Sequence, residues 1–164
     1  MEDYQRERIA TFFNPSLNPL EEGYNITQAM IAVGAGNLFG RGIGFGSQSQ
    51  LKFLPESQND FIFAVLAEEL GFFGVCLVLA LFGVFFYKSI ANTRKIKDNF
   101  GVFFILGMVS LIFIEMFVNI GMNIGILPVI GISLPFLSYG GSGLIASMAL
   151  VGMAENIIIR SKIK

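Results

Sequence analysis

The sequence predicts an all-α, polytopic transmembrane protein in which about three membrane-spanning helices follow a long polar loop region. Hydrophobic residues make up 54% of the 164 residues, charged residues make up 14%, and the mean hydropathy is +0.67. Because soluble domains carry about 25% charged residues, this composition is typical of a membrane protein. Three long apolar runs, separated by a basic segment and by a segment rich in Gly and Pro, provide the expected spans.

The composition also excludes several classes of function. A formal net charge of −1 leaves no basic field to hold phosphates, so no nucleic acid is expected as a partner. The chain has no His, which excludes imidazole catalysis and His-ligated metal sites. Its one cysteine, Cys76, lies in an apolar run and cannot form a disulfide within the chain, so we expect an inert thiol.

The chain divides at residue 60 into two regions of different polarity. Residues 1–60 are rich in charged and turn-forming residues and predict a loop region with short helices. Residues 61–164 predict the transmembrane region, because about 18 apolar residues or more are long enough to suggest a membrane span. The expected spans are residues 61–87, 100–120 and 142–159.

Two features organise the polar region. Asn25 to Val33 predict a short helix whose N-cap is Asn25 or Thr27. Gly34 to Gly46 predict a close-packed loop, in which bare backbone lets segments approach each other or a ligand. The loop contains GxG spacings, but no strand pattern precedes it, so a nucleotide-binding loop is not favoured.

The segment from Gly121 to Gly141 is apolar but interrupted by glycines and by Pro128 and Pro135. Irregular backbone at membrane depth is tolerated only where protein or a cavity surrounds it. We therefore expect a loop or re-entrant segment between the second and third spans.

The distribution of basic residues predicts the orientation in the membrane. The basic segment 88–99 and the basic C-terminal tail are separated by two spans, so both lie on one side, which should be the cytoplasm. Residues 1–60 and 121–141 then face outward, and Asp60 lies at the outer interface at the start of the first span. The basic residues on the cytoplasmic side are Lys88, Arg94, Lys95, Lys97, Arg160, Lys162 and Lys164.

Asp60 marks the border between the polar region and the first apolar run. A carboxylate at the start of a helix accepts hydrogen bonds from free N–H groups and complements the helix dipole. A carboxylate at such a border also suits general base catalysis. Both interpretations stay open on residue type alone.

Other charged residues near lipid also have two interpretations. Glu68, Glu69 and Glu115 lie within apolar runs, where ionisable groups are costly and indicate function or a hydrogen-bonded structural role. Because Glu68 and Glu69 are adjacent, at least one of them must face protein. Arg41 and Lys52 flank the glycine-rich loop, on the same outer side of the membrane as Asp60. They are either solvated loop charges or part of a site that binds an anion such as a pyrophosphate.

Several motifs together resemble one known family. They are Gln48 to Glu56, Asn59 to Val65, Glu68 to Phe72, Asn119 to Met122, and Leu134 to Ser142. These motifs are similar to those of the SEDS family (shape, elongation, division and sporulation), which includes RodA, FtsW and SpoVE, and they are more similar to the RodA branch. The resemblance covers nearly the whole chain. It implies the C-terminal part of a fold of roughly ten spans, with a large extracellular loop.

The resemblance implies a peptidoglycan glycosyltransferase that polymerises lipid II on the outer face of the bacterial cytoplasmic membrane during cell elongation. Asp60 would be the catalytic base of a single inverting displacement. No cofactor and no metal ligand are assigned, although a divalent cation is an open alternative for neutralising the pyrophosphate. The residues expected to bind substrate are Arg41, Lys52, Glu56, Gln58, Ser138 and Tyr139.

One departure from the family pattern affects this mechanism. The family usually has His-Thr before the catalytic Asp, whereas this chain has Gln58 and Asn59. Any help that the His gives to proton transfer is therefore absent.

Two other functions compete with catalysis. The chain could belong to a lipid II flippase, in which the intramembrane acids would serve transport, and a transport assay separates this function from polymerisation. It could also be an inactive, truncated scaffold that binds a class B penicillin-binding protein, a transpeptidase with which SEDS proteins pair. Binding without turnover would single out the scaffold.

Overall fold

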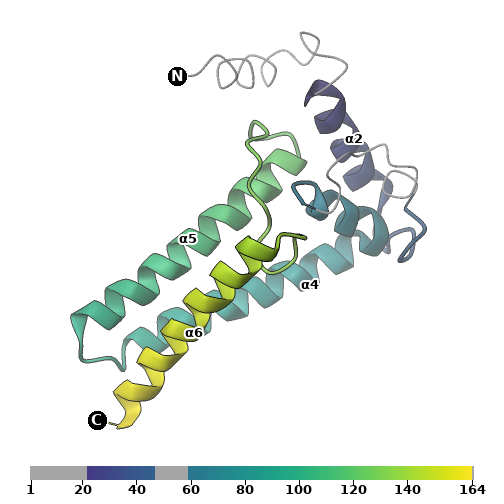
Figure 1. The fold of residues 1–164 in the computed structure, drawn as a ribbon. Coiled ribbons are helices and arrows are strands. Elements are labelled where there is room, and N and C mark those ends of the chain that lie inside the picture. Colours follow the sequence, from purple (N-terminus) through teal and green to yellow (C-terminus); the bar gives the residue numbers. More distant parts are fainter. Residues whose placement is uncertain (1–21, 47–58, 164) are drawn as a thin grey trace, which may run out of the picture.

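The computed structural model describes residues 22–46 and 59–163 (Figure 1). Within these two ranges the chain forms four α-helices and no β-strand, which confirms the predicted all-α class. The helices are α2 (Glu22–Ala35), α4 (Ile62–Thr93), α5 (Asn99–Asn123) and α6 (Gly141–Ile163).

Three of these helices, α4, α5 and α6, are long and apolar enough to cross a membrane, as the sequence predicts. Their apolar surface is mostly uncovered: even in the most buried span, α5, only 33% of the apolar window is buried by the rest of the chain. Exposed apolar residues on this scale would be unfavourable in water, so these faces are suited to lipid or to further helices.

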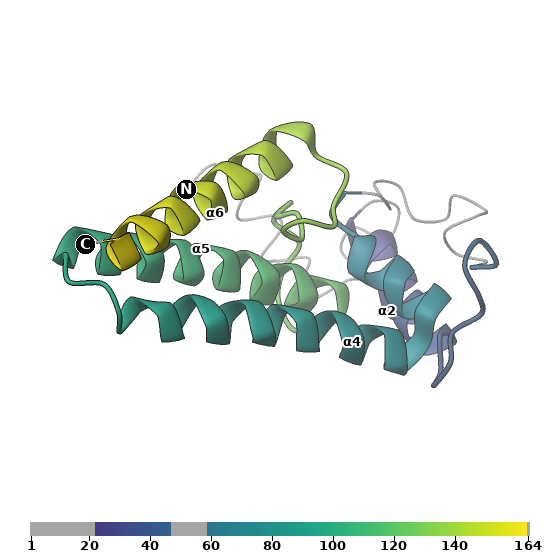
Figure 2. The same cartoon turned by 90° about the horizontal axis from the view of Figure 1, so that it is seen from below.

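The helices α4 and α5 run antiparallel and are joined by residues 94–98, and α6 lies across them (Figures 1 and 2). Both views place the C-terminal end of α6 beside the α4–α5 connection, so the basic segments share one end as predicted. The loop 124–140 and α2 lie toward the other end. The core between the helices includes Phe82, Ile105, Ile112, Leu134 and Ile158.

The helix α4, which contains most of the predicted span 61–87, consists of two parts. Gly71 has φ 67° and ψ −167°, a conformation that interrupts the helix. Figure 2 shows the second part, residues 72–93, running alongside α5, whereas the first part, residues 62–70, lies at an angle beside α2. A glycine inside an apolar run is often tolerated in a helix, so its presence alone did not indicate the break.

The glycine-rich loop, Gly34–Gly46, docks on this break and satisfies its backbone. A broken helix leaves carbonyl and amide groups without intrahelical partners, and lipid cannot replace them. Four backbone hydrogen bonds join the loop to the break: Arg41 N to Glu68 O (2.9 Å), Gly42 N to Glu69 O (3.0 Å), Phe72 N to Asn37 O (2.9 Å) and Phe73 N to Leu38 O (3.2 Å). The prediction that bare backbone allows a close approach of two segments is confirmed.

The helix α2 covers the first part of α4. Ala29 and Ala32 of α2 are fully buried against Phe61 and Ala64, and these small side chains let the two helices come close. The predicted short helix therefore exists, but its predicted cap is wrong. The helix begins at Glu22, so Thr27 lies inside it and donates its hydroxyl to Gly23 O (2.8 Å).

The segment 124–140 between α5 and α6 is irregular, as its glycines and prolines predict. It starts later than predicted because α5 continues to Asn123. Phe136 anchors the segment on α4, where its ring lies 6.2 Å from that of Phe82 and 5.8 Å from that of Phe85. Leu134 is 1% exposed and belongs to the core.

The substitution Gly71→Ala should destabilise the fold. The backbone at Gly71 adopts a region that only glycine occupies readily, at a cost of about 1–3 kcal/mol for another residue. A Cβ there would also lie 2.2 Å from Gly40 N, so the loop would have to move. We expect a clearly lower midpoint of thermal unfolding in detergent, followed by circular dichroism.

The matched control is Gly83→Ala, also in α4, where an added Cβ meets nothing within 4 Å. Alanine favours helix over glycine, so this control should be neutral or slightly stabilising. Equal midpoints for the two variants would show that the break at residue 71 tolerates a side chain.

Candidate functional site

Asp60 lies in the turn of residues 59–61 that leads into α4, and its side chain is half-buried. Its carboxylate faces the segment 124–140: a Cβ added at Gly131 would lie 3.5 Å from Asp60 Oδ2. The acid therefore sits between the start of α4 and the irregular segment. Figure 1 shows the start of α4 toward the end of the bundle opposite the basic connection.

Two asparagines of α5 hold the backbone of Asp60. Asn119 and Asn123 are both fully buried, and each donates a hydrogen bond of 3.0 Å from Nδ2 to Asp60 O. Asn123 Oδ1 also accepts from Ala64 N (3.1 Å), and Asn119 Nδ2 donates to Ile132 O (2.8 Å). We call these two residues the asparagine pair.

Ser138 ties the irregular segment to the same turn. Its hydroxyl donates to Asn59 O (2.8 Å) and accepts from Leu134 N (2.7 Å). A hydroxyl has one hydrogen to donate and two lone pairs, so Ser138 could still accept one hydrogen bond from a ligand. Its predicted role in substrate binding stays a prediction, and its role within the fold is an addition to it.

Tyr139, the other candidate in this segment, is 79% exposed. Its side chain is thus open to a ligand or to the bilayer, and its predicted role in substrate binding stays a prediction.

The start of α4 bears on the interpretation of Asp60 as a helix cap. The N-cap position is Phe61, one residue after Asp60, and the amide of Ala64 is satisfied by Asn123. The structure therefore places Asp60 outside the position from which a cap residue normally acts.

The structure places Arg41 at the other end of the first part of α4. Its backbone amide bonds to Glu68, eight residues beyond Asp60, which corresponds to a rise of about 12 Å along a helix. Its exposed side chain donates from Nε to Ala35 O (3.4 Å). The backbone of Arg41 thus belongs to the docked loop, and its role in binding an anion stays a prediction. Lys52, Glu56 and Gln58 lie outside the described residues.

The two adjacent acids of α4 both lie near the glycine-rich loop. Glu68 is fully buried, which confirms that at least one of them faces protein. Glu69 is half-buried, and its Oε1 accepts a hydrogen bond from Gly44 N (3.1 Å). This contact gives Glu69 a structural role in holding the loop.

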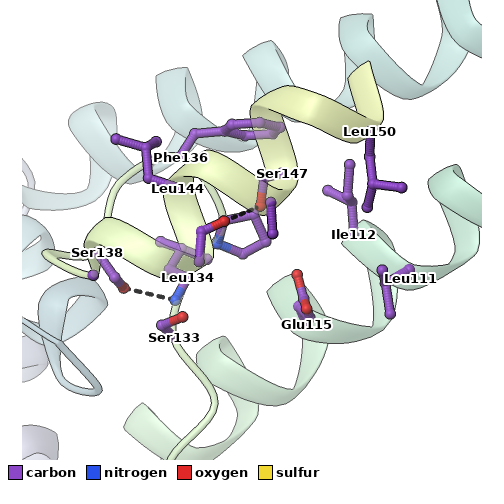
Figure 3. Close-up of a pocket in the computed structure, with 14 residues that line it drawn as sticks. Leu111, Ile112, Glu115, Ser133, Leu134, Phe136, Ser138, Leu144, Ser147 and Leu150 are labelled. Carbon is purple, nitrogen blue, oxygen red and sulfur yellow. Dashed lines mark hydrogen bonds between the residues drawn. The ribbon is translucent and has the colours of Figure 1, made fainter. Parts of the chain in front are cut away.

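Glu115 points from α5 into a cavity of about 90 Å³ between α5, α6 and the segment 124–140 (Figure 3). Ser133 and Ser147 supply hydroxyl groups to the same cavity. Intramembrane acids usually face a bundle interior or water rather than lipid, and this volume corresponds to about three water molecules. Glu115 follows that rule.

A metal site is not indicated by clustering of ligands. Among residues 22–46 and 59–163, no group of three or more Cys, Asp or Glu side chains could hold a metal ion. The divalent cation that the family resemblance leaves open stays a prediction.

Comparison with known proteins decides the family. The family of FtsW, RodA and SpoVE, described as "Cell cycle protein", matches residues 1–163. The chain belongs to this family. Peptidoglycan glycosyltransferase MrdB of Escherichia coli K12 is 47% identical over 157 residues, which are 96% of this chain and 42% of MrdB. Stage V sporulation protein E of Bacillus subtilis is 47% identical over 156 residues, 94% of this chain and 42% of that protein.

Solved structures of the FtsW/RodA/SpoVE family share the fold. A peptidoglycan synthase complex, studied for the coordination of polymerization and crosslinking, contains a chain that matches with a TM-score of 0.77 and 30% identity over 98% of this chain and 43% of that one. A crystal structure of a mutant of the Thermus thermophilus rod shape determining protein RodA matches with a TM-score of 0.60 and 31% identity, over 80% of this chain and 38% of that one. The chain thus spans less than half the length of these relatives.

Membership of the FtsW/RodA/SpoVE family confirms the predicted resemblance and a multi-pass membrane protein. Of the predicted site residues, the structure brings Asp60 and Ser138 to one place through the turn of residues 59–61. The asparagine pair was not predicted to belong to this site. Two amide side chains four residues apart near the end of an apolar span share one helix face, and this spacing was the available signal.

The substitution Ser138→Ala should lower the stability of the fold. It removes the hydroxyl that accepts from Leu134 N and donates to Asn59 O. Leu134 is only 1% exposed, so water cannot replace the lost acceptor. Leaving a buried amide without its acceptor costs about 1–3 kcal/mol. The free energy of unfolding in detergent measures the effect.

Tyr139→Phe is the matched control, because it removes one hydroxyl from the neighbouring, exposed residue. It should leave the free energy of unfolding unchanged within about 0.5 kcal/mol. If Ser138→Ala behaved like this control, the hydroxyl bridge would not contribute to stability.

Proposed function

We propose that this chain carries the catalytic base, Asp60, of a peptidoglycan glycosyltransferase that polymerises lipid II on the outer face of the cytoplasmic membrane during cell elongation. The observation that carries the proposal is the placement of Asp60: a half-buried carboxylate on a backbone fixed from α5. The names of the relatives support the reaction class, since those from Escherichia coli and Treponema pallidum are both peptidoglycan glycosyltransferases.

In the proposed reaction Asp60 acts as general base. It accepts the proton of the acceptor sugar hydroxyl while that oxygen attacks the anomeric carbon of the donor. The bond from the anomeric carbon to the pyrophosphate breaks, undecaprenyl pyrophosphate leaves, and the configuration at that carbon inverts. One base therefore suffices.

The leaving pyrophosphate requires positive charge near it. Arg41 and Lys52 are the candidates within this chain, and a divalent cation is the alternative. The lipid tail of the substrate would lie against the uncovered apolar faces of α4, α5 and α6, while its sugars and pyrophosphate lie at the polar end of the bundle.

A class B penicillin-binding protein is the proposed partner. The support is the likeness to a chain of a peptidoglycan synthase complex in which polymerization and crosslinking are coordinated. Polymerisation of glycan strands produces the substrate for crosslinking, so an enzyme for each step would act together. Co-purification of the two proteins in detergent tests this assignment.

The orientation follows from the charges. The exposed basic residues Arg94, Lys95 and Lys97 lie in the connection between α4 and α5. Figure 1 shows this connection at the same end of the bundle as the C-terminal end of α6. The positive-inside rule assigns this end to the cytoplasm and Asp60 to the outer side.

Labelling of single cysteines tests this orientation. In a Cys76→Ser background, Tyr139→Cys should react with a membrane-impermeant maleimide on intact cells, because Tyr139 is exposed near the Asp60 end. Lys97→Cys should react only after lysis. The reverse pattern would place Asp60 in the cytoplasm and contradict the proposed reaction, because polymerisation occurs outside.

The substitution Asp60→Asn tests the base. It keeps the shape of the side chain but removes its ability to accept a proton, so glycan formation should fall by at least about 100-fold. Labelled lipid II in proteoliposomes provides the assay, with the chain used alone and joined to the preceding part of Escherichia coli MrdB. Binding of lipid II should be retained.

Asp98→Asn is the control, because Asp98 is an exposed acid beside the basic connection at the opposite end of α4 and α5. Its glycan formation should equal that of the unchanged chain. Full polymer from Asp60→Asn would exclude Asp60 as the base.

A further inference from the structure

A side chain of α5 completes the first turn of α4. Phe61 is the N-cap, so the amide of Ala64 is one of the donors at the helix start that have no acceptor within the helix. Ala64 N donates to Asn123 Oδ1 (3.1 Å), and Asn123 Nδ2 donates to Asp60 O (3.0 Å), the carbonyl four residues before Ala64. The next pair along the chain, Val65 N and Phe61 O, forms the ordinary bond (3.2 Å).

The side-chain amide of Asn123 therefore bridges an amide of the first helical turn and the carbonyl of Asp60. Asn119 adds a second hydrogen bond to the same carbonyl, so both lone pairs of Asp60 O are used. The remaining N–H of Asn123 donates to Asn119 O (2.8 Å), and that of Asn119 donates to Ile132 O (2.8 Å). Fully satisfied buried networks of this kind favour a single geometry.

We infer that the asparagine pair are positioning residues for the proposed reaction, and that Asn123, inserted between the carbonyl of Asp60 and the amide of Ala64, acts as a wedge that fixes Asp60 just before the helix. The wedge sets the direction of the carboxylate toward Gly131 and the segment 124–140. This inference rests on the proposed function, because it assigns the wedge a role through Asp60 as base.

The arrangement does more than cap the helix. Capping needs only an acceptor for the amide of Ala64, which Asn123 Oδ1 supplies. Both asparagines in addition donate to Asp60 O, so two side chains hold the backbone of Asp60. A misplacement of a catalytic group by about 1 Å can cost about 100-fold in rate, so this hold matters for the proposed base.

The substitution Asn123→Asp tests the wedge with a change of only one atom. A protonated carboxyl offers one acceptor and one donor in the same fork as the amide, whereas an ionised carboxyl has no donor for Asp60 O. The ratio of the variant kcat to the wild-type kcat should therefore rise as the pH falls. We expect it to be lower by about 10- to 100-fold at high pH and to approach 1 at low pH, with little change in KM for lipid II.

Two further variants complete the comparison. Asn123→Leu keeps the approximate volume but has no polar atom, so its kcat ratio should be low at every pH. Asn156→Asp, on an exposed position of α6, introduces the same acid away from the turn, and its ratio should stay near 1. Asp60 on α4 and Glu115 on α5 titrate in all of these proteins, so their own titration is common to both terms of the ratio. A carboxylate at position 123 would also repel that of Asp60. Asn123→Leu separates this repulsion from the loss of the hydrogen bonds, because it removes the bonds without adding a charge.

The unfolding midpoint gives a readout that does not depend on activity. In Asn123→Asp only the neutral acid makes both bonds, so the folded state holds a proton that the unfolded state releases more easily. The stability of this variant relative to wild type is then greatest at low pH and is lost as the pH rises. Asn156→Asp should show no such trend.

The outcomes separate cleanly. A kcat ratio for Asn123→Asp that is independent of pH, whether high or low, overturns the positioning role. A midpoint relative to wild type that is independent of pH overturns the wedge geometry itself. Full polymer from Asp60→Asn overturns the proposed function, and that failure is visible before the asparagine variants are scored. The inference stands if both the kcat ratio and the midpoint recover at low pH.

Discussion

Backbone groups that leave a regular helix within a membrane bundle must find partners inside the protein, because lipid supplies none. This chain leaves regular helix twice near one end, at Gly71 and at the turn that carries Asp60. At both places the missing partners come from segments distant in the sequence. The fold near that end is arranged around meeting this requirement.

The two places meet the requirement by different means. At Gly71 the partners are backbone groups of the glycine-rich loop, so the contact depends on the absence of side chains, as the 2.2 Å approach of a Cβ at Gly71 to Gly40 N shows. At Asp60 the partners are the side chains of Asn119, Asn123 and Ser138. Side chains can be placed and tuned by substitution, which suits a site whose exact geometry matters for chemistry.

The parts of this fold that depend on local properties could be predicted from the sequence. The spans follow from the length of the apolar runs, and the irregular segment 124–140 follows from its glycines and prolines. The break at Gly71 could not be predicted, because its stability depends on a loop about 30 residues earlier in the chain. For the same reason the sequence placed Arg41 on the side of Asp60 but could not show that its backbone bonds to Glu68.

Asp60 was chosen as the candidate base from its border position and its motif, and that role stays a prediction. The hydrogen bonds around it were not predicted, because only the packing of α5 against the start of α4 brings the asparagine pair to it. Asn119 lies within another quoted motif, but an asparagine in an apolar span has many uses, and its partner at Asp60 is 59 residues away. Its role is evident only in the structure, where α5 continues to Asn123. Asn119 and Asn123 then lie on the same face of α5, and this face meets the start of α4.

The same hydrogen bonds that satisfy the turn also suit it to catalysis. A base in a partly buried site works best when surrounding dipoles are fixed before the reaction, so that they need not reorganise as charge moves. The amides of Asn119 and Asn123 are fixed by burial and by complete hydrogen bonding, and they hold the residue whose carboxylate would receive the proton. A membrane bundle that must satisfy non-helical backbone therefore already contains much of what a preorganised base requires, and Asp60 stands at the place where this requirement is met by side chains.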